Sequence, residues 1–147
     1  MATDQLHAIP NTNPRNQPLA NQNALFGGDE LRSFNGTFQL VFQESDGNLV
    51  LYIDDPSENP NAGLINSAIW SAFTQNNSAS YAIMQDDGNF VVYDSFGNHF
   101  FKTDTQGNPG AFIILQDDGN LVVYAADGVT ALWQSITSAG EARGSNA

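Results

Sequence analysis

The strongest constraint on the fold is that the chain contains one short motif three times. QDDGNFVVY at 85–93 and QDDGNLVVY at 116–124 differ only by Phe for Leu, and QESDGNLVLY at 43–52 is a third copy with an extra residue before its Asp-Gly. A large aromatic residue stands at the equivalent place of each unit, as Trp70, Phe101 and Trp133. A unit of about 31 residues cannot bury its apolar face alone, so the three units must pack around a common axis. We predict that the three aromatic residues meet on this axis as core.

Each unit has the composition of short β-strands. Segments such as YAIMQ, NFVVYD, AFIILQ and NLVVY are rich in β-branched and aromatic residues, and Asp-Gly or Gly-Asn pairs punctuate them. No stretch has the apolar periodicity of a helix. The sequence therefore predicts an all-β fold with pseudo-threefold symmetry.

The register of the second hairpin decides which of its side chains share a face. A two-residue Asp-Gly turn and a three-residue loop over 86–88 are the two alternatives. We favour the longer loop, because it places Met84 opposite Phe90 and keeps one face of the hairpin apolar. Successive side chains of a strand point to opposite faces, so the motif residues then share the other face of the hairpin, and the Asp lies in the loop above the end of this face. In this copy they are Gln85, Asp87, Asn89, Val91 and Tyr93.

The other two copies follow the same rule with one difference. In the third copy the shared face carries Gln116, Asp118, Asn120, Val122 and Tyr124. In the first copy a four-residue loop over 44–47 is needed to keep the same register. Its face then carries Gln43, Asp46, Asn48, Val50 and Tyr52, and the longer loop distorts the geometry of this site.

These faces suit a sugar better than a reaction. Two amides, a carboxylate and a phenol surround a small apolar patch, and together they can donate and accept several hydrogen bonds. We expect no catalytic residue, metal ligand or cofactor: His7 and His99 have no nucleophile partner in any motif. The adjacent Asp residues lack the ligand spacing of an EF-hand, so turn formation explains them better than calcium binding or glycoside hydrolysis.

The composition of the chain limits the classes of binding partner and the cellular compartments that can be expected. The net charge of −12 opposes binding to phosphate backbones, so no nucleic-acid partner is expected. The absence of Cys excludes disulfides and is compatible with a reducing compartment. No secretory leader or membrane span is visible, which predicts a cytoplasmic protein, or one secreted without a visible signal peptide, and no membrane insertion.

Three segments are expected along the chain. Residues 1–22, with Pro10, Pro14 and Pro18 among Asn and Gln, predict a flexible polar arm without a regular element. Residues 23–139 form the repeated domain, and 140–147 a loose tail.

The pattern Gln-x-Asp-x-Asn-x-Val-x-Tyr, present at 85–93 and 116–124 and with one extra residue at 43–52, resembles that of the monocot mannose-binding lectins, also called bulb-type or B-lectins. The resemblance covers about 23–138, including ALFGGDEL and the pairs Ile69-Trp70 and Leu132-Trp133. It implies a β-prism II fold with three four-stranded antiparallel sheets. It also implies mannose recognition, with Gln and Asp or Asn contacting the 2- and 3-hydroxyls and Tyr the 4-hydroxyl.

The resemblance implies partners as well. A multivalent, non-catalytic lectin for terminal α-mannose or high-mannose glycans and glycoproteins is expected, and a homodimer formed by exchange of the strand at 131–138. The alternative is a lectin-fold module for protein interaction or self-assembly with vestigial sugar sites. The chain departs from the family by lacking its disulfide and by having Phe101 in place of a Trp.

Overall fold

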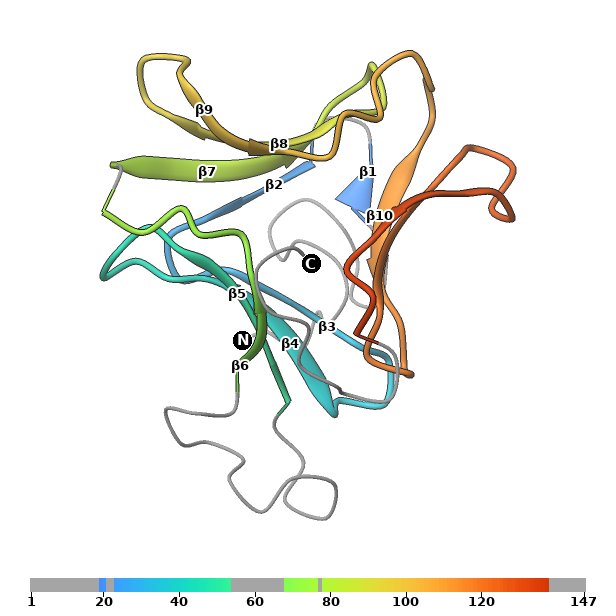
Figure 1. Cartoon of the computed structure of the whole chain (residues 1–147), viewed down its shortest axis with the longest axis horizontal. Helices are drawn as coiled ribbons and strands as arrows, with labels where there is room; N and C mark the ends of the chain where they lie inside the picture. The colour runs from blue at the N-terminus through green and yellow to red at the C-terminus, as the bar shows by residue number, and fades with distance from the viewer. Residues whose placement is uncertain (1–18, 21–22, 54–67, 77, 138–147) are drawn as a thin grey trace.

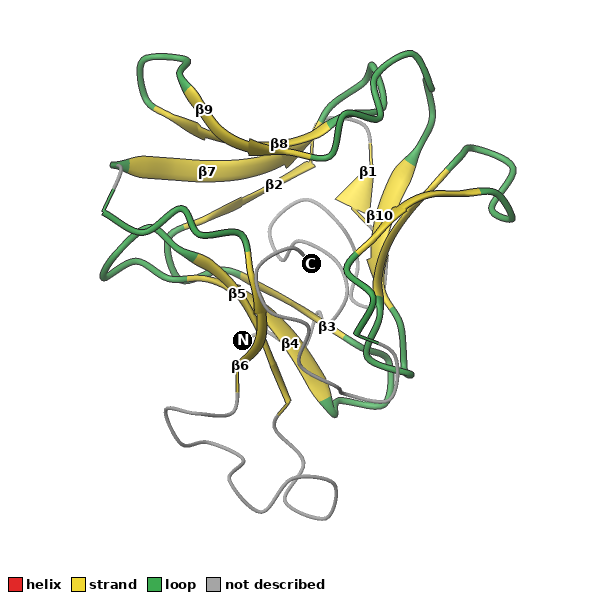
Figure 2. Cartoon of the chain, in the orientation of Figure 1, coloured by secondary structure: helices red, strands yellow, loops and turns green. Residues whose placement is uncertain are grey.

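The structure of the protein, a computed structural model, describes residues 19–20, 23–53, 68–76 and 78–137. Across these ranges every regular element is a β-strand, and the strands form three four-stranded antiparallel sheets (Figure 2). The part of the chain described here contains no helix that could span a membrane. The predicted all-β, β-prism II fold is confirmed.

Each sheet holds one copy of the repeated hairpin. The first sheet contains, in order, β3 (Glu30–Arg32), β4 (Phe38–Phe42), β5 (Leu49–Ile53) and β6 (Ala68–Ser71). The second contains β2 (Asn23–Phe26), β7 (Ala79–Met84), β8 (Phe90–Asp94) and β9 (His99–Lys102). The third contains β1 (Leu19–Ala20), β10 (Phe112–Leu115), β11 (Leu121–Tyr124) and β12 (Ala131–Gln134). The three sheets surround a common centre and face outward in three directions (Figure 1).

One edge strand of each sheet comes from the N-terminal part of the chain, which is not repeated. β1, β2 and β3 follow one another in sequence, yet each pairs with a different hairpin, with β10, β7 and β4 respectively. The expectation that 1–22 contains no regular element is therefore wrong at Leu19–Ala20, where backbone pairing with Ile113 and Phe112 makes an edge strand. The predicted tail at 140–147, like 1–18, lies outside the described residues.

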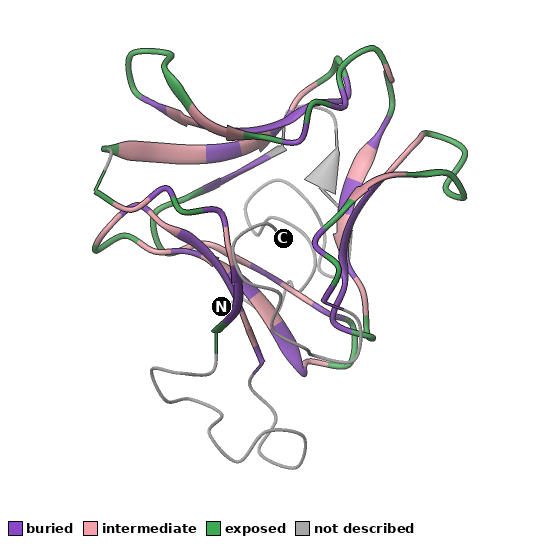
Figure 3. Ribbon diagram, viewed as in Figure 1, coloured by how far each residue is buried: buried purple, intermediate pink, exposed green. Residues whose placement is uncertain are grey.

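The hairpins adopt the predicted registers. Met84 pairs with Phe90 in the second sheet, and Phe42 pairs with Leu49 in the first. All four of these side chains point inward and are almost completely buried. Buried residues lie mainly in the strands, and many exposed residues lie in the connecting loops (Figure 3).

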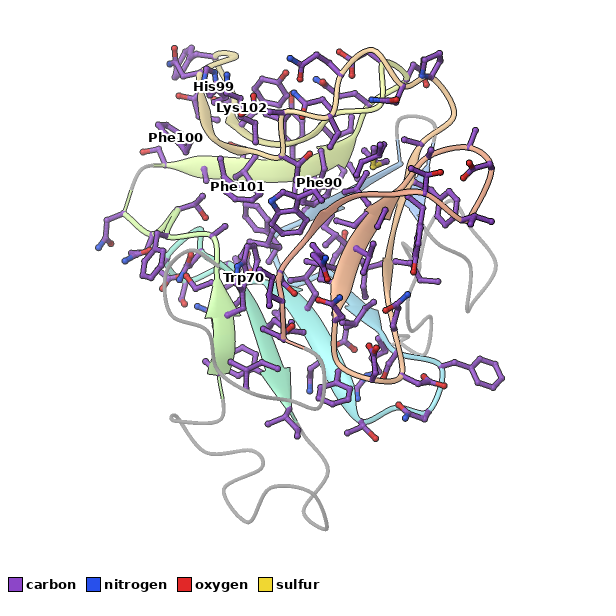
Figure 4. The ribbon with its side chains drawn as sticks, turned by 45° about the vertical axis from the view of Figure 1, so that its right-hand side comes forward. Trp70, Phe90, His99, Phe100, Phe101 and Lys102 are labelled. Atoms are coloured by element: carbon purple, nitrogen blue, oxygen red, sulfur yellow. The ribbon has the colours of Figure 1, made fainter. Side chains whose placement is uncertain are left out.

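The axis of the prism is closed by the three equivalent aromatic residues. The ring centroids of Trp70, Phe101 and Trp133 lie 5.6, 5.8 and 5.9 Å apart in pairs, and every pair is edge-to-face, at 72–76°. Phe101 points from the second sheet toward Trp70, whereas His99 and Lys102 of the same strand lie on the outer side (Figure 4). The predicted packing of these residues as core is confirmed, and Phe101 makes both edge contacts that its position requires.

The strand expected to exchange between copies pairs within its own chain. β12 is hydrogen-bonded to β11, with Val123 opposite Trp133. Strand exchange and the homodimer stay predictions.

Candidate functional site

In the second sheet the motif residues gather on the outer face of β8. The backbone N–H of Gln85 donates to the backbone carbonyl of Asn89 at 2.9 Å, so 86–88 form the three-residue loop that the sequence favours. Phe90 and Val92 point into the core with no exposed surface, which places Val91 and Tyr93 on the opposite face. Val91 is itself 2% exposed, so it forms the floor of the site.

The loop of this hairpin is held in place by hydrogen bonds to the side chain and to the backbone carbonyl of Asp87. The Asn89 backbone N–H donates to Asp87 Oδ1 at 2.9 Å, which orients the carboxylate over the outer face. The backbone N–H groups of Gly107 and Asn108 donate to the Asp87 carbonyl at 2.9 and 3.1 Å. The described hydrogen bonds leave Asp87 Oδ2 unused, so it can accept from a ligand.

Residues of the turn after β9 orient the side chain of Asn89 through hydrogen bonds to its oxygen. Asn89 Oδ1 accepts from the Thr105 backbone N–H and from Thr103 Oγ1, each at 3.2 Å. The Thr105 hydroxyl in turn donates to the Gly88 carbonyl at 2.5 Å. Because the oxygen of Asn89 is occupied on the inner side, its amide nitrogen is the group left to contact a ligand.

The other two polar groups of this face contact each other. Gln85 Nε2 donates to the Tyr93 hydroxyl oxygen. A phenol that accepts this bond keeps its own proton for another acceptor, and Gln85 Oε1 remains an acceptor. The second copy therefore presents donors from Asn89 and Tyr93 and acceptors from Asp87 and Gln85 on one surface.

The third copy repeats this arrangement. The Asn120 backbone N–H donates to Asp118 Oδ1 at 2.9 Å, and Gln116 Nε2 donates to the Tyr124 hydroxyl. Asn120 Oδ1 accepts from the backbone N–H groups of Ile136 and Thr137 at 2.9 and 3.2 Å. As in the second copy, Val122 is 2% exposed and forms the floor.

One contact distinguishes the third copy from the second. Asn120 Nδ2 donates to Gln134 Oε1 at 2.8 Å, so one of its two amide hydrogens is occupied. The residue opposite Val91 in the second sheet is Lys102 instead, and its ammonium group lies 3.4 Å from Asp104 Oδ1. One Asn120 hydrogen remains for a ligand, so the two sites offer the same kinds of group.

The first copy has the same residues, but their polar groups satisfy one another. Gln43 Nε2 donates to both carboxylate oxygens of Asp46, at 3.1 and 3.2 Å, and Tyr52 OH donates to Gln43 Oε1. Asp46 Oδ1 also accepts from the Asn48 backbone N–H at 2.9 Å. The side chains of Gln43, Asp46 and Tyr52, whose counterparts face outward in the other copies, are therefore bonded to one another here.

The extra loop residue explains this closure. The Gly47 N–H bonds to the Gln43 carbonyl at 2.8 Å across a four-residue loop, one residue longer than the loop at 86–88. The carboxylate of Asp46 comes near both Gln43 and Tyr52, whereas Asp87 has no described contact with Gln85. Burial, and then the negative charge of Asp46, raise the pKa of Tyr52, so this phenol keeps its proton well above neutral pH.

The residues that orient the three Asn side chains lie outside the repeated motif and were not predicted from the sequence. They are the hydroxyl residues Ser71 and Thr74, Thr103 and Thr105, and Ser135 and Thr137. A signal for them exists, because a Thr follows each axial aromatic residue at the same spacing in all three units. These residues act on a ligand only through the Asn that they hold.

The described residues include no cluster of three or more His, Asp or Glu side chains arranged to hold a metal ion. What the second and third copies offer is a shallow surface of hydrogen-bonding groups over a valine floor. Such a surface matches a small ring with neighbouring hydroxyl groups.

Comparison with solved structures finds the same fold in lectins. A lectin from Marasmius oreades is 31% identical, with a TM-score of 0.71, and the match covers 87% of this chain and 97% of that one. A monomeric monocot mannose-binding lectin from Gastrodia elata is 32% identical, with a TM-score of 0.62, covering 79% of this chain and 93% of that one. The mannose-specific agglutinin of snowdrop (Galanthus nivalis), in complex with methyl α-D-mannoside, is 34% identical, with a TM-score of 0.57, covering 70% and 84%. No protein-family model and no curated protein sequence matches the chain.

Proposed function

The chain belongs to the family of bulb-type mannose-binding lectins, and we propose that it binds terminal α-mannose on glycans and glycoproteins through two of its three motif faces. The proposal rests on the hydrogen-bond pattern of the second and third sheets. There the Asn oxygen is bonded inward, and the groups left outward are a carboxylate oxygen, an amide nitrogen, an amide oxygen and a phenol proton. Two donors and two acceptors side by side suit adjacent sugar hydroxyls, each of which both donates and accepts.

The first motif face is excluded from this proposal. A sugar entering there would have to break the bonds among Gln43, Asp46 and Tyr52 before forming its own. Exchanging one set of hydrogen bonds for another gains little free energy. We therefore expect the first sheet to serve the fold and not the glycan.

Two sites on different faces make the molecule multivalent. A single shallow polar site binds weakly, at about millimolar Kd, because each hydroxyl only exchanges water for protein. Sites on the second and third sheets face in different directions, so one chain can engage two glycans on a dense surface. Joint engagement raises the apparent affinity by about 10²- to 10⁴-fold, and homodimer formation would add further sites. No covalent step is part of this function.

The proposal is tested by replacing the site Asn residues with Asp. Asp keeps the oxygen that accepts from the turn backbone but replaces the outward amide nitrogen with an acceptor. Asn89→Asp and Asn120→Asp should each weaken binding of methyl α-mannoside by about 10-fold or more at the altered face, because an anion replaces a donor. Asn48→Asp is the matched control, since Asn48 Oδ1 accepts from the Thr74 N–H in the same way, at 2.9 Å.

The expected result is loss of glycan binding in the double variant Asn89→Asp/Asn120→Asp, with binding intact in Asn48→Asp. Circular dichroism and thermal unfolding establish that each variant is folded. If the folded double variant still binds mannosides or agglutinates cells, the site assignment is wrong. If the folded wild-type chain binds no mannoside but captures a protein partner, the alternative of an interaction module replaces the proposal.

A further inference from the structure

A row of aromatic rings extends from the second motif face to the edge of its sheet. Tyr93, the phenol of the site, lies opposite Tyr81 on β7, and Tyr81 lies opposite Phe26 on β2. The ring centroids are 5.7 Å apart for the first pair and 5.6 Å for the second, with interplanar angles of 35° and 33°. The three rings therefore lie side by side on the outer face, and we call them the aromatic strip.

The strip is accessible where it is farthest from the site. Phe26 is 50% exposed on the edge strand, although a large apolar side chain is usually buried. On the other side of Tyr93 the register places His99, which is exposed on the outer side of the sheet (Figure 4). A ligand bound over Gln85 and Asn89 could thus extend across Tyr93 onto Tyr81 and the exposed Phe26.

The other two sheets lack this strip at the same register. In the first sheet the residues in register with Tyr52 are Gln39 and then Arg32, neither of them aromatic. In the third sheet Phe112 lies beside Tyr124 at 5.8 Å, but the next residue in register is Ala20. The repeated motif is shared by all three sheets, so the strip is a property of the second site alone.

Resting on the proposed mannose function, we propose that the second sheet binds an oligosaccharide of at least two neutral pyranose residues, with mannose in the motif site and the adjoining sugar stacked on Tyr81 and Phe26. A pyranose ring presents an apolar C–H face of about the size of an aromatic ring. The negative π-face of the aromatic ring attracts these C–H groups of the sugar, and stacking removes apolar surface of both the sugar and the aromatic side chain from water. Phe26 and Tyr81 are then specificity-determining residues that select an extended glycan over a single mannose.

Charge points to a neutral sugar. The chain carries a net charge of −12, and Asp86 and Asp87 lie in the loop of this same hairpin. A carboxylate or sulfate on the neighbouring sugar would be repelled by this field. The cation beside this site, Lys102, lies 3.4 Å from Asp104 Oδ1, so a carboxylate already partners its charge.

The test isolates the second site and compares ligands of two lengths. In the background Asn48→Asp/Asn120→Asp only the second site is intact, and Asn48→Asp/Asn89→Asp leaves only the third. Affinities are measured by NMR titration for methyl α-mannoside and for methyl α-mannobiosides of different linkage. We expect at least one mannobioside to bind the second site about 10-fold more tightly than the monosaccharide, and the third site to discriminate by no more than about 3-fold.

Removing the strip should abolish the discrimination but not the binding. Phe26→Thr, a change at a half-exposed edge position, and separately Tyr81→Thr should reduce the preference of the second site for the mannobioside to about 3-fold or less. The affinity for methyl α-mannoside should stay within about 2-fold, because neither residue is one of the motif residues assigned to the first sugar. Threonine is chosen because it retains β propensity, and thermal unfolding confirms that each variant is folded.

Failure of the inference is distinct from failure of the function. A second site that binds the monosaccharide but prefers no mannobioside, or that keeps its preference in both Thr variants, overturns the role of the strip alone. A wild-type chain that is folded and binds no methyl α-mannoside overturns the function and the inference together. If Phe26→Thr instead converts a dimer into a monomer and leaves sugar preference unchanged, the strip is an interface between copies and the proposal is wrong.

Discussion

The loop that positions Asp87 should be intolerant of any side chain at Gly88. Gly88 has φ of +96°, a conformation that alanine adopts at a cost of about 1–2 kcal/mol. A Cβ built there would press on the Asn108 carbonyl oxygen, and would lie 2.8 Å from the Asn108 carbonyl carbon and 2.9 Å from the Thr105 oxygen. All three atoms are backbone, so the clash cannot be relieved by a side-chain rotation and should add about 1–3 kcal/mol.

Gly97→Ala is the control that separates these two effects. Gly97 has φ of +92°, but nothing lies within 4 Å of its Cβ position, so alanine there meets backbone strain only. We expect Gly97→Ala to lower the free energy of unfolding by about 1–2 kcal/mol and Gly88→Ala by about 2–5 kcal/mol. At roughly 2–4 °C per kcal/mol for a chain of this size, Gly88→Ala should lower Tm by about 4–20 °C.

The assay is reversible thermal or urea unfolding, followed by mannoside titration of the folded fraction. Gly88→Ala should also weaken binding at the second site, because the displaced loop carries Asp87, and should leave the third site unchanged. Equal losses of stability in the two variants would refute the packing argument. Normal mannoside binding at the second site in Gly88→Ala would refute the role given to the loop.

Three further outcomes follow from the same geometry. Tyr124→Phe should weaken mannoside binding at the third site by about 3- to 10-fold through loss of one hydrogen bond, whereas Tyr52→Phe should leave glycan binding unchanged; equal losses in the two would contradict the closure of the first site. Ile136 has φ of 61°, which β-branched residues rarely adopt, so Ile136→Asn should raise the free energy of unfolding by about 0.5–1 kcal/mol in urea unfolding. Hydrogen bonds from the Asn98 side chain, and then from nearby backbone N–H groups, hold the pKa of Asp94 below its ordinary value of about 3.9. The contribution of the Asp94 carboxylate to stability is therefore present above about pH 3.9 and is lost as pH falls through the lowered pKa. Asp94→Asn should remove this part of the acid sensitivity in a series of unfolding curves, and an unchanged pH profile would count against it.

Much of the fold follows from local rules that the sequence displays. The alternation of Met84, Phe90 and Val92 against Asn89 and Tyr93 admits only one hairpin register with a clean apolar face, and the structure has that register. The recurrence of a large aromatic residue likewise predicts the axis, because three equivalent positions in a threefold arrangement must meet there. These features are repeated, so each copy supports the interpretation of the others.

The features that escaped prediction are not repeated or depend on distant pairing. Leu19–Ala20 become a strand only because β10 offers an edge, and nothing in the residues 1–22 indicates it. The bonds that close the first copy depend on where a one-residue longer loop places Asp46, which residue types alone do not reveal. The aromatic strip joins Phe26 to Tyr81 across a pairing between segments far apart in sequence, so it could not be seen before the sheet order was known.

The central claim is that two motif faces are open to mannose and the first is closed by its own hydrogen bonds. Site-resolved NMR tests it directly, by following the side-chain amide signals of Asn48, Asn89 and Asn120 while methyl α-mannoside is added. The Asn89 and Asn120 signals should shift and saturate, while the Asn48 signal should stay in place. Equal shifts at all three, or a shift at Asn48 alone, would contradict it.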